Sequence, residues 1–176
     1  MNAGAYGSEI SNYFAAATTI TMTGEIKKYS QGDIKFSYRD STFPKNEILV
    51  NATFACEKGD IEYIHKQKLL ASQKRKDNQP LKFRSAGSIF KNPNSECAAG
   101  MLIDKAGLKG KREGNAEISL KHANFIVNLG GALAEDVLKL IRMVQSEVAR
   151  QFNVKLELEV QLLGFSQAIH EELAHA

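Results

Sequence analysis

Apolar residues recur in the C-terminal part of the chain with the two periods that distinguish helices from strands. In segment 133–152 they return every three or four positions, which predicts a helix with one buried stripe. In segment 154–162 apolar and polar residues alternate, which predicts a half-buried strand whose polar face carries Glu159. Gly130 and Gly131 break the chain ahead of the helix.

The N-terminal part of the chain favours strands. Segment 18–29 combines a β-branched run with Gly24, a pattern typical of a β-hairpin. Segment 34–39 alternates between apolar and polar residues, which predicts a half-buried strand with Arg39 on its polar face. Segment 48–56 is a second apolar run of strand length, so three strands are predicted here.

A helix is predicted to begin after Asp60, because an aspartate suits the N-cap position ahead of an apolar pattern at helical spacing. The pattern ends in the charge run 74–77, shortly before Pro80. A proline restricts the residue before it to extended conformations, so the helix is expected to pass into an extended linker there. This is the best candidate for a domain boundary.

The remaining segments are short. A turn region is predicted for 85–93, a helix for 98–106 ended by Gly107, and strands for 117–120 and 125–128. Helices and strands are mixed without a regular alternation of strand and helix. The sequence therefore predicts the α+β class and not a doubly wound parallel sheet.

Composition narrows the functional classes. The chain has 176 residues, of which 43% are hydrophobic, so it can bury a core and is not globally disordered. Its net charge of +3 is too small to indicate nucleic-acid binding, and the basic run 74–76 is the only support for that alternative. We expect no transmembrane segment or secretory signal, and Cys56 and Cys97 fit no metal-ligand spacing. We expect a soluble cytoplasmic protein without metal, nucleic acid or membrane insertion, in an oligomeric state that the pattern does not indicate.

Segment 85–93 carries the most informative candidate chemistry. Gly87 precedes Ser88, so another group can approach the serine hydroxyl closely, and Asn92 adds a side chain that both donates and accepts. The alternative reading is a structural turn in which Ser88 bonds to the backbone. A Gly-x-Ser-x-Gly elbow is absent from the sequence, so a hydrolase nucleophile is not supported.

Several short motifs resemble, in the right order, those of the UDP-N-acetylenolpyruvoylglucosamine reductase family. Segment 85–93, Ser-Ala-Gly-Ser-Ile-Phe-Lys-Asn-Pro, resembles the signature of that family. The other stretches that agree with the family are 2–7 with Glu9, 38–41 with Phe43, 79–81, 99–110, 119–128, and 158–160 with Gly164. Each motif alone is weak, whereas six in the right order are strong. The resemblance runs from residue 2 to about Gly164.

The resemblance implies a division of the chain into two domains. Residues 1–78 resemble the end of a flavin-binding α+β domain, residues 79–164 a small α+β substrate-binding domain, and residues 165–176 form a tail. The active site is expected between the two domains. The short connections after Asn92 and after Arg39 resemble the subtype of the family that lacks a substrate-covering loop.

The resemblance also implies a reaction. In this family NADPH reduces FAD, the reduced flavin passes hydride to the enolpyruvyl double bond of a UDP-sugar, and a serine protonates the neighbouring carbon. Ser88 occupies the place of that serine, and Glu159 the place of an assisting glutamate. Arg39 occupies the place of an arginine near the substrate carboxylate. Taken without the resemblance, Glu159 and Arg39 are solvated surface charges.

Ligand contacts are implied at further positions. Candidates for contact with the flavin are Asn2, Ala3, Gly4, Ala5, Tyr6, Gly7 and Arg75. Candidates for contact with the substrate diphosphate or sugar are Lys91, Asn92 and His122, although a lone histidine is more often structural. The glycine-rich loop that holds the FAD pyrophosphate in this family has no counterpart here. A UDP-sugar-binding fragment without flavin, and another flavin oxidoreductase on the same scaffold, are therefore the alternatives.

Overall fold

The computed structural model describes residues 1–5, 7–94 and 96–175, so Tyr6 of the predicted flavin-contacting loop lies outside the described residues. The chain divides into two compact units, Met1–Ala71 and Ser72–Ala176. The division falls within helix α1 (Ile61–Asn78), and the domain boundary expected after residue 78 stays a prediction. None of the helices in the described residues has the length and apolar character needed to span a membrane.

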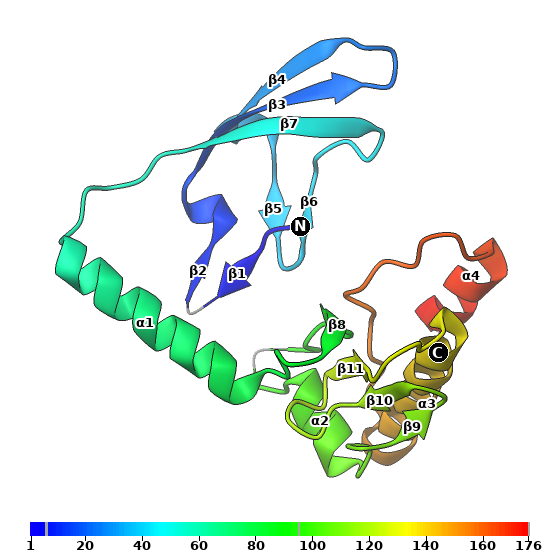
Figure 1. Cartoon of the computed structure of the whole chain (residues 1–176). Helices are drawn as coiled ribbons and strands as arrows, with labels where there is room; N and C mark the ends of the chain where they lie inside the picture. The colour runs from blue at the N-terminus through cyan, green and yellow to red at the C-terminus, as the bar shows by residue number, and fades with distance from the viewer. Residues whose placement is uncertain (6, 95, 176) are drawn as a thin grey trace. The chain divides into compact units, whose positions relative to one another are not determined.

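The first unit is built on antiparallel strands (Figure 1). Strands β3, β4 and β7 form a sheet in the order β4-β3-β7, and two small hairpins accompany it. The elements of this unit are β1 (Gly4–Ala5), β2 (Ser8–Glu9), η1 (Ile10–Asn12), β3 (Phe14–Thr21), β4 (Ile26–Ser30), η2 (Gln31–Asp33), β5 (Phe36–Ser37), β6 (Asp40–Ser41), β7 (Glu47–Phe54) and the start of α1. The predicted hairpin and the strand at 48–56 are both confirmed, and Gly24 has the positive φ of 87° that its turn requires.

An aromatic cluster supplies most of the core of this unit. Phe14 is buried, and its ring meets those of Phe36 and Phe43 edge to face, with centroids 5.3 and 5.8 Å apart. Tyr29 packs on Phe43 in the same way. Edge-to-face pairs of this kind stabilise by about 0.5–1.5 kcal/mol beyond the area they bury. The cluster joins the sheet to the β5–β6 hairpin.

The prediction of a strand at 34–39 is wrong for the second half of that segment. Strand β5 covers only two residues, and the chain turns back at Tyr38 and Arg39 to pair with β6. Arg39 has a positive φ of 56°, because a two-residue hairpin turn requires left-handed backbone. Arg39 is therefore a turn residue and not a residue on a strand face. Its guanidinium lies 5.1 Å from the centroid of the Tyr38 ring.

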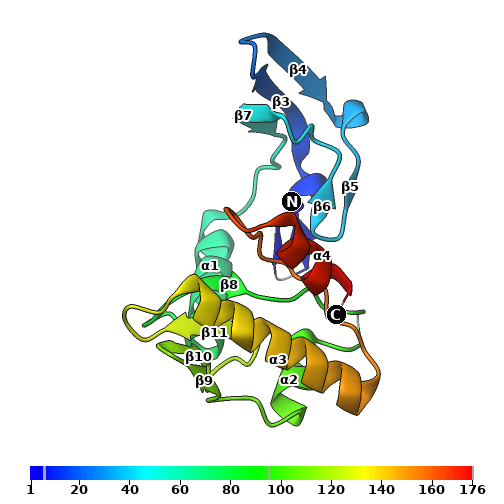
Figure 2. The same ribbon diagram turned by 90° about the vertical axis from the view of Figure 1, so that its right-hand side faces the viewer.

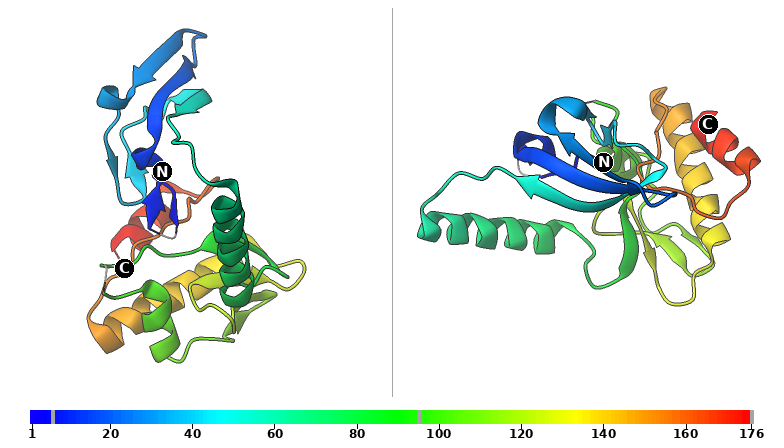
Figure 3. Two further views of the ribbon diagram at one scale, coloured as in Figure 1. Left: turned by 90° about the vertical axis from the view of Figure 1, so that its left-hand side faces the viewer. Right: turned by 90° about the horizontal axis from the view of Figure 1, so that it is seen from above.

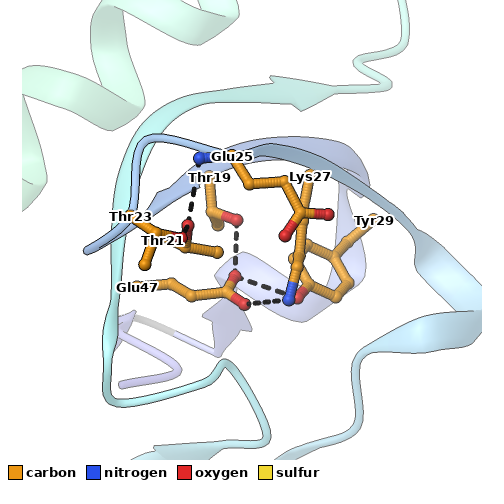
Figure 4. A network of polar contacts seen from close by, with 7 residues as sticks. All are labelled: Thr19, Thr21, Thr23, Glu25, Lys27, Tyr29 and Glu47. Atoms are coloured by element: carbon orange, nitrogen blue, oxygen red, sulfur yellow. Dashed lines mark hydrogen bonds and ion pairs between the residues drawn. The ribbon is translucent and has the colours of Figure 1, made fainter.

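A buried carboxylate ties the three strands of the sheet together (Figure 4). The Glu47 side chain is 4% exposed and accepts hydrogen bonds from Thr19 Oγ1 at 2.6 Å, Tyr29 Oη at 2.9 Å and Lys27 Nζ at 3.1 Å. These bonds, led by the one from Thr19, hold the pKa of Glu47 below its ordinary value against the opposing effect of burial. The ionised carboxylate is therefore part of the fold of the first unit.

We expect Glu47→Gln to lower the melting temperature of the first unit by several degrees. The melting temperature of the variant should also change less as the pH is lowered. Because the pKa of Glu47 is lower in the folded chain than in the unfolded chain, its contribution is complete above the unfolded value of about 4.3 and is lost as the pH falls through the folded value. All five tyrosines precede residue 64, so tyrosine fluorescence reports on this unit. Glu25→Gln, an exposed change on the same hairpin, should leave the melt unchanged. Equal effects of the two changes would contradict the prediction.

The second unit packs helices against an antiparallel sheet of order β8-β11-β10-β9 (Figure 2). Its elements after the end of α1 are β8 (Arg84–Ser88), α2 (Ala99–Lys105), β9 (Arg112–Glu113), β10 (Ala116–Ile118), β11 (Phe125–Asn128), α3 (Ala134–Phe152) and α4 (Gln167–His175). The apolar stripe of α3 lies on the sheet, with Leu138, Ile141 and Val144 buried beside Ile118 and Ile126. This unit is α+β, as predicted.

Several predicted elements of the second unit are confirmed, together with the helix that leads into it. Helix α1 begins at the expected cap, where Asp60 Oδ1 accepts a hydrogen bond from Tyr63 N at 2.6 Å. It ends at Asn78, just after the charge run. Helices α2 and α3 and strands β10 and β11 lie within two residues of their predicted positions. Gly107 ends α2 with a φ of 71°.

Two predictions for this unit are wrong, and one helix was not predicted. Segment 85–93 was expected to be a turn region, but its first residues form β8 because they pair with β11. Segment 154–162 is extended but forms one isolated bridge, Leu158 to Phe90, and no strand ladder. The tail contains α4, which lies beside α3 (Figure 3) and is held there by an ion pair between Glu172 and Arg142.

Candidate active site

Ser88 occupies the end of β8, at the point where two hollows meet. Its Cα pairs with that of Phe125 in β11, and Gly87 before it has a positive φ of 90°. The half-buried Ser88 side chain lines one pocket of about 680 Å³ and a second of about 620 Å³. No hydrogen bond of the Ser88 hydroxyl is found among the described residues. The side chain is thus presented to open space.

The segment that carries Glu159 lies directly against the residues after Ser88. Glu159 N donates to the carbonyl oxygen of Ile89 at 2.8 Å, and Lys91 N donates to that of Glu157 at the same distance. The bridge between Phe90 and Leu158 lies between these two bonds. The structure therefore brings the half-buried Glu159 next to segment 85–93, called the serine loop below, although the two segments are far apart in the sequence.

Asn124 fixes the serine loop, and the sequence analysis missed it. Its side chain is bonded on both sides to one residue, with Nδ2 donating to the Phe90 carbonyl at 2.8 Å and Oδ1 accepting from Phe90 N at 2.9 Å. Its own carbonyl accepts from Ile89 N at 2.9 Å. Asn124 is 4% exposed. Its position inside an apolar run could have identified it from the sequence. An amide side chain that is buried with such a run must form hydrogen bonds to nearby polar groups.

The first pocket has a positive rim. Lys105, Lys109 and Lys121 line it, and Asp104 is the acidic residue among its lining residues. Asp104 pairs with Lys109 at 2.6 Å, which leaves a net positive charge at the pocket. Lys121 Nζ also donates to the carbonyl oxygen of Lys76 at 2.5 Å. Ammonium groups gathered in this way suit a phosphate or carboxylate ligand. All three lysines lie in the family-like stretches 99–110 and 119–128, but the sequence alone offers no reason to assign them a ligand contact.

His122 projects into the same pocket as a neutral imidazole. Burial lowers its pKa, and the positive charge of Lys109 acts in the same direction. Its Nδ1 accepts a hydrogen bond from Asn124 N at 3.3 Å, which assigns the proton of the neutral ring to Nε2. The ring packs on Gly100, where a Cβ atom would lie 3.1 Å from Cε1. His122 can therefore offer an N–H donor without adding charge.

We expect nitrogen NMR of the chain to show His122 as the Nε2–H tautomer with a pKa below 6.5. Because this pKa is lower in the folded chain, the unfolded chain takes up the proton more readily. The contribution of His122 to the unfolding free energy is therefore complete above about pH 6.5 and is lost as the pH falls below that value. The variant His122→Gln should remove the assigned signal and flatten the dependence of the unfolding free energy on pH below about 6.5. A pKa above 6.5, or an Nδ1–H tautomer, would contradict the geometry.

The other two predicted substrate contacts differ in position. Asn92 lines the pocket, and its Oδ1 accepts from Ala99 N at 3.0 Å, which satisfies a backbone donor at the start of α2. Lys91 pairs instead with Glu157 at 3.2 Å and is not among the residues that line the pocket. The structure thus brings together Ser88, Asn92 and His122, while Lys91 lies outside this group.

The predicted flavin-contacting loop is a tight hairpin in the first unit. Asn2 Nδ2 donates to Glu9 Oε2 at 2.6 Å, and Asn2 Oδ1 accepts from Ser11 N at 3.0 Å. A Cβ atom at Gly4 would lie 2.9 Å from Glu9 Cγ, so the two strands need a glycine there. Gly7 has a φ of 83° and open space around its Cα. Ala3, Ala5 and Gly7 are all exposed residues.

These features fit the close approach of a flat group to the backbone of the hairpin. Arg75 belongs to the second unit and donates from Nε to Gln79 Oε1 at 3.1 Å. It lines the second pocket, which also contains Ser88. Arg39 lies in the first unit, so its convergence with Ser88 and Glu159 stays a prediction.

The chain matches known proteins over most of its length. Residues 79–163 match the sequence model of the family described as UDP-N-acetylenolpyruvoylglucosamine reductase, C-terminal domain. The UDP-N-acetylenolpyruvoylglucosamine reductase of Listeria monocytogenes (serotype 4a) is 47% identical over 167 residues, which cover 93% of this chain and 55% of the relative. That of Clostridium novyi is 46% identical over 165 residues, which cover 93% of this chain and 53% of the relative.

A solved structure agrees with these matches. The crystal structure of the reductase (MurB) from Thermus caldophilus matches with a TM-score of 0.79 and 38% identity, covering 92% of this chain and 57% of that one. The chain thus spans about half the length of the curated relatives it matches. This chain is a relative of the UDP-N-acetylenolpyruvoylglucosamine reductases, and its residues 79–163 belong to the family of their C-terminal domain.

Proposed function

We propose that this site serves the reduction of UDP-N-acetylglucosamine enolpyruvate to UDP-N-acetylmuramate, a step of peptidoglycan synthesis, with FAD as cofactor and NADPH as reductant. One observation carries the proposal. Ser88 lies at the edge of a lysine-rich pocket and next to the segment that carries Glu159. The cytoplasmic location expected from the cysteine usage is part of the same proposal.

Proton donation is the role assigned to Ser88. Flavin that NADPH has reduced would supply the hydride to one carbon of the enolpyruvyl double bond, and negative charge would then develop on the neighbouring carbon beside the carboxylate. A serine hydroxyl is a weak acid, so it can donate only to a strongly basic carbon held in fixed geometry. The pairing of Ser88 with β11 and the bonds from Asn124 to the serine loop supply that rigidity. Glu159 is assigned to assist this transfer.

Positive and neutral donors are assigned to the anionic parts of the substrate. Lys109 and Lys121 suit the two phosphates, and the neutral N–H of His122 suits a phosphate or sugar oxygen. Asn92 has its Nδ2 group as a further donor. Arg39 is assigned to the substrate carboxylate, where a fixed guanidinium offsets the charge that develops during reduction.

The cofactor contacts are assigned to the β1–β2 hairpin and to Arg75. The small exposed residues of the hairpin and the open space at Gly7 leave room for a flat ring, and Arg75 shares the second pocket with Ser88. In this assignment residues 1–78 are the end of a flavin-binding domain and residues 79–164 the substrate-binding domain. No residue of this chain is assigned to the pyrophosphate of FAD.

The first test is binding of UDP to the purified chain by calorimetry. Lys109→Ala and Lys121→Ala should each weaken binding about tenfold, because each removes a charge-assisted hydrogen bond to phosphate. Lys139→Ala, an exposed change on α3, should leave the affinity within about twofold. Failure to bind UDP, or equal effects of all three changes, would remove the substrate assignment.

A second candidate function is UDP-sugar binding without flavin chemistry, which the lysines lining the pocket at Ser88 favour. Flavin absorbance in the purified chain would exclude it. A different flavin oxidoreductase is distinguished by kinetics. NADPH oxidation that does not depend on the enolpyruvyl sugar would favour that alternative.

A further inference from the structure

Gln145 is a polar residue among the buried apolar residues of α3, and only 1% of it is exposed. Its Nε2 group donates two hydrogen bonds, to the carbonyl oxygens of Leu156 and Leu173, each at 2.9 Å. Its Oε1 atom is also buried and has no hydrogen-bond partner among the described residues. Because a buried acceptor without a partner is unfavourable, the packing of α3 does not by itself explain an amide at this position.

The two carbonyl groups that Gln145 binds lie where regular secondary structure supplies no donor. Leu173 is in the last turn of α4, and the carbonyl groups of a last helical turn have no partner within the helix. Leu156 is in the extended segment 154–162, which forms one bridge and no strand ladder. One NH₂ group therefore anchors both α4 and the start of the segment that carries Glu159 to the same point of α3.

The Glu159 segment and the serine loop are joined by backbone hydrogen bonds, and each is also tied to the rest of the second unit by a buried amide. Asn124, just before β11, binds both backbone groups of Phe90 in the serine loop. Gln145, on α3, binds Leu156, three residues before Glu159. The two amides thus hold the two sides of the contact on which the candidate site is built.

We propose that Gln145 is a positioning residue for Glu159. Without its Nε2 donors, the Leu156 carbonyl and the last turn of α4 lose a buried partner together, and residues 156–173 lie between these two anchors. The segment then separates from the serine loop more often, and Glu159 loses its fixed place relative to Ser88. The role in the reaction rests on the function proposed above, in which Glu159 assists Ser88, whereas the anchoring of the segment does not.

The test is hydrogen exchange in the whole chain without ligand, comparing the unaltered protein with Gln145→Met. Methionine is similar in length and shape but has no donor. The amides of Lys91 and Glu159 donate across the contact, so they report its opening, while the amide of Val148 inside α3 reports unfolding of the whole unit. In the variant, exchange at the two contact amides should rise at least about tenfold relative to Val148.

A kinetic measurement connects this anchoring to the reaction. In the flavin-loaded enzyme, Gln145→Met should slow formation of the reduced sugar about tenfold and leave flavin reduction by NADPH unchanged. A uniform rise in exchange at all three amides would overturn the proposal, and so would a selective rise without slower sugar formation. An unaltered enzyme that forms no reduced sugar would contradict the proposed function instead, and the exchange rates alone would then decide whether Gln145 anchors the segment.

Arg142→Ala is the matched control. Arg142 lies on α3 three residues before Gln145 and pairs with Glu172 of α4 at 2.7 Å, so its removal loosens α4 while both hydrogen bonds of Gln145 remain. Exchange at Lys91 and Glu159 should stay within about twofold of the unaltered chain. An effect as large as that of Gln145→Met would show that the docking of α4, and not the amide, holds the segment.

A second variant covers the case in which Gln145→Met does not fold. At about pH 5 a buried carboxyl group is neutral and donates through a single O–H, so Gln145→Glu can serve one of the two carbonyl groups. A rise of several-fold in exchange at the two contact amides relative to Val148 is then expected. An unchanged exchange ratio in this variant would overturn the proposal.

Discussion

Replacing Ser88 by alanine in the flavin-loaded enzyme is expected to lower formation of the reduced sugar about 100- to 10,000-fold, while reduction of the flavin by NADPH continues unchanged. The size follows from the loss of a positioned proton donor. The asymmetry follows from the role proposed for Ser88, whose hydroxyl is assigned to the sugar half-reaction and to no step of flavin reduction; Ser88 lines the lysine-rich pocket. Single-turnover measurements of the two half-reactions separate the effects.

Ser85→Ala is the matched control for this prediction. Ser85 lies on the same strand, and its Oγ accepts a weak hydrogen bond from Gly87 N at 3.4 Å. Its removal should change neither half-reaction by more than a few-fold. An equal loss of both half-reactions in Ser88→Ala would show that this serine holds the structure and does not transfer a proton.

Replacing Asn124 by leucine should lower the unfolding free energy of the second unit by about 2–4 kcal/mol. Leucine is similar in size but cannot bond to Phe90, so the Phe90 N–H and C=O groups lose their partners in the interior. Each buried backbone group left unpaired costs about 1–3 kcal/mol. Far-ultraviolet circular dichroism during urea unfolding should report the change, because most helical residues of the second unit lie in α2, α3 and α4.

The tyrosines provide an internal control for the Asn124 variant. All of them lie in the first unit, so their fluorescence transition should stay at the same urea concentration. Asn115→Leu, a change at an exposed position, should alter the unfolding free energy by less than about 0.5 kcal/mol. A stable Asn124 variant would show that the serine loop is held by other contacts.

Elements specified by local signals were predictable from the sequence. The N-cap at Asp60, the turn glycine at Gly24 and the apolar stripe of α3 each act within a few residues, and all three are found where expected. The order of the family motifs identified Ser88 and Glu159 as candidates. The structure adds that their segments are neighbours, while their catalytic roles and that of Arg39 stay predictions.

Features that depend on distant partners were not predictable. The residues of β8 look like a turn, and they become a strand because β11 is available to pair with them. Segment 154–162 alternates as a strand should, yet a single bridge is all the pairing it makes. Helix α4 was missed because its apolar pattern is short, although Leu173 is buried. Arg39 was misplaced because the position of a two-residue turn cannot be read from alternation.

The contact between the serine loop and the Glu159 segment has a consequence for the synthesis of this chain. The ion pair beside that contact joins residues 66 positions apart. A ribosome therefore releases Ser88 well before the residues that complete its surroundings exist. Closing so long a loop is entropically costly and tends to occur late in folding. A nascent chain that stops before residue 157 should contain β8 sequence but no assembled site, whatever ligand is present.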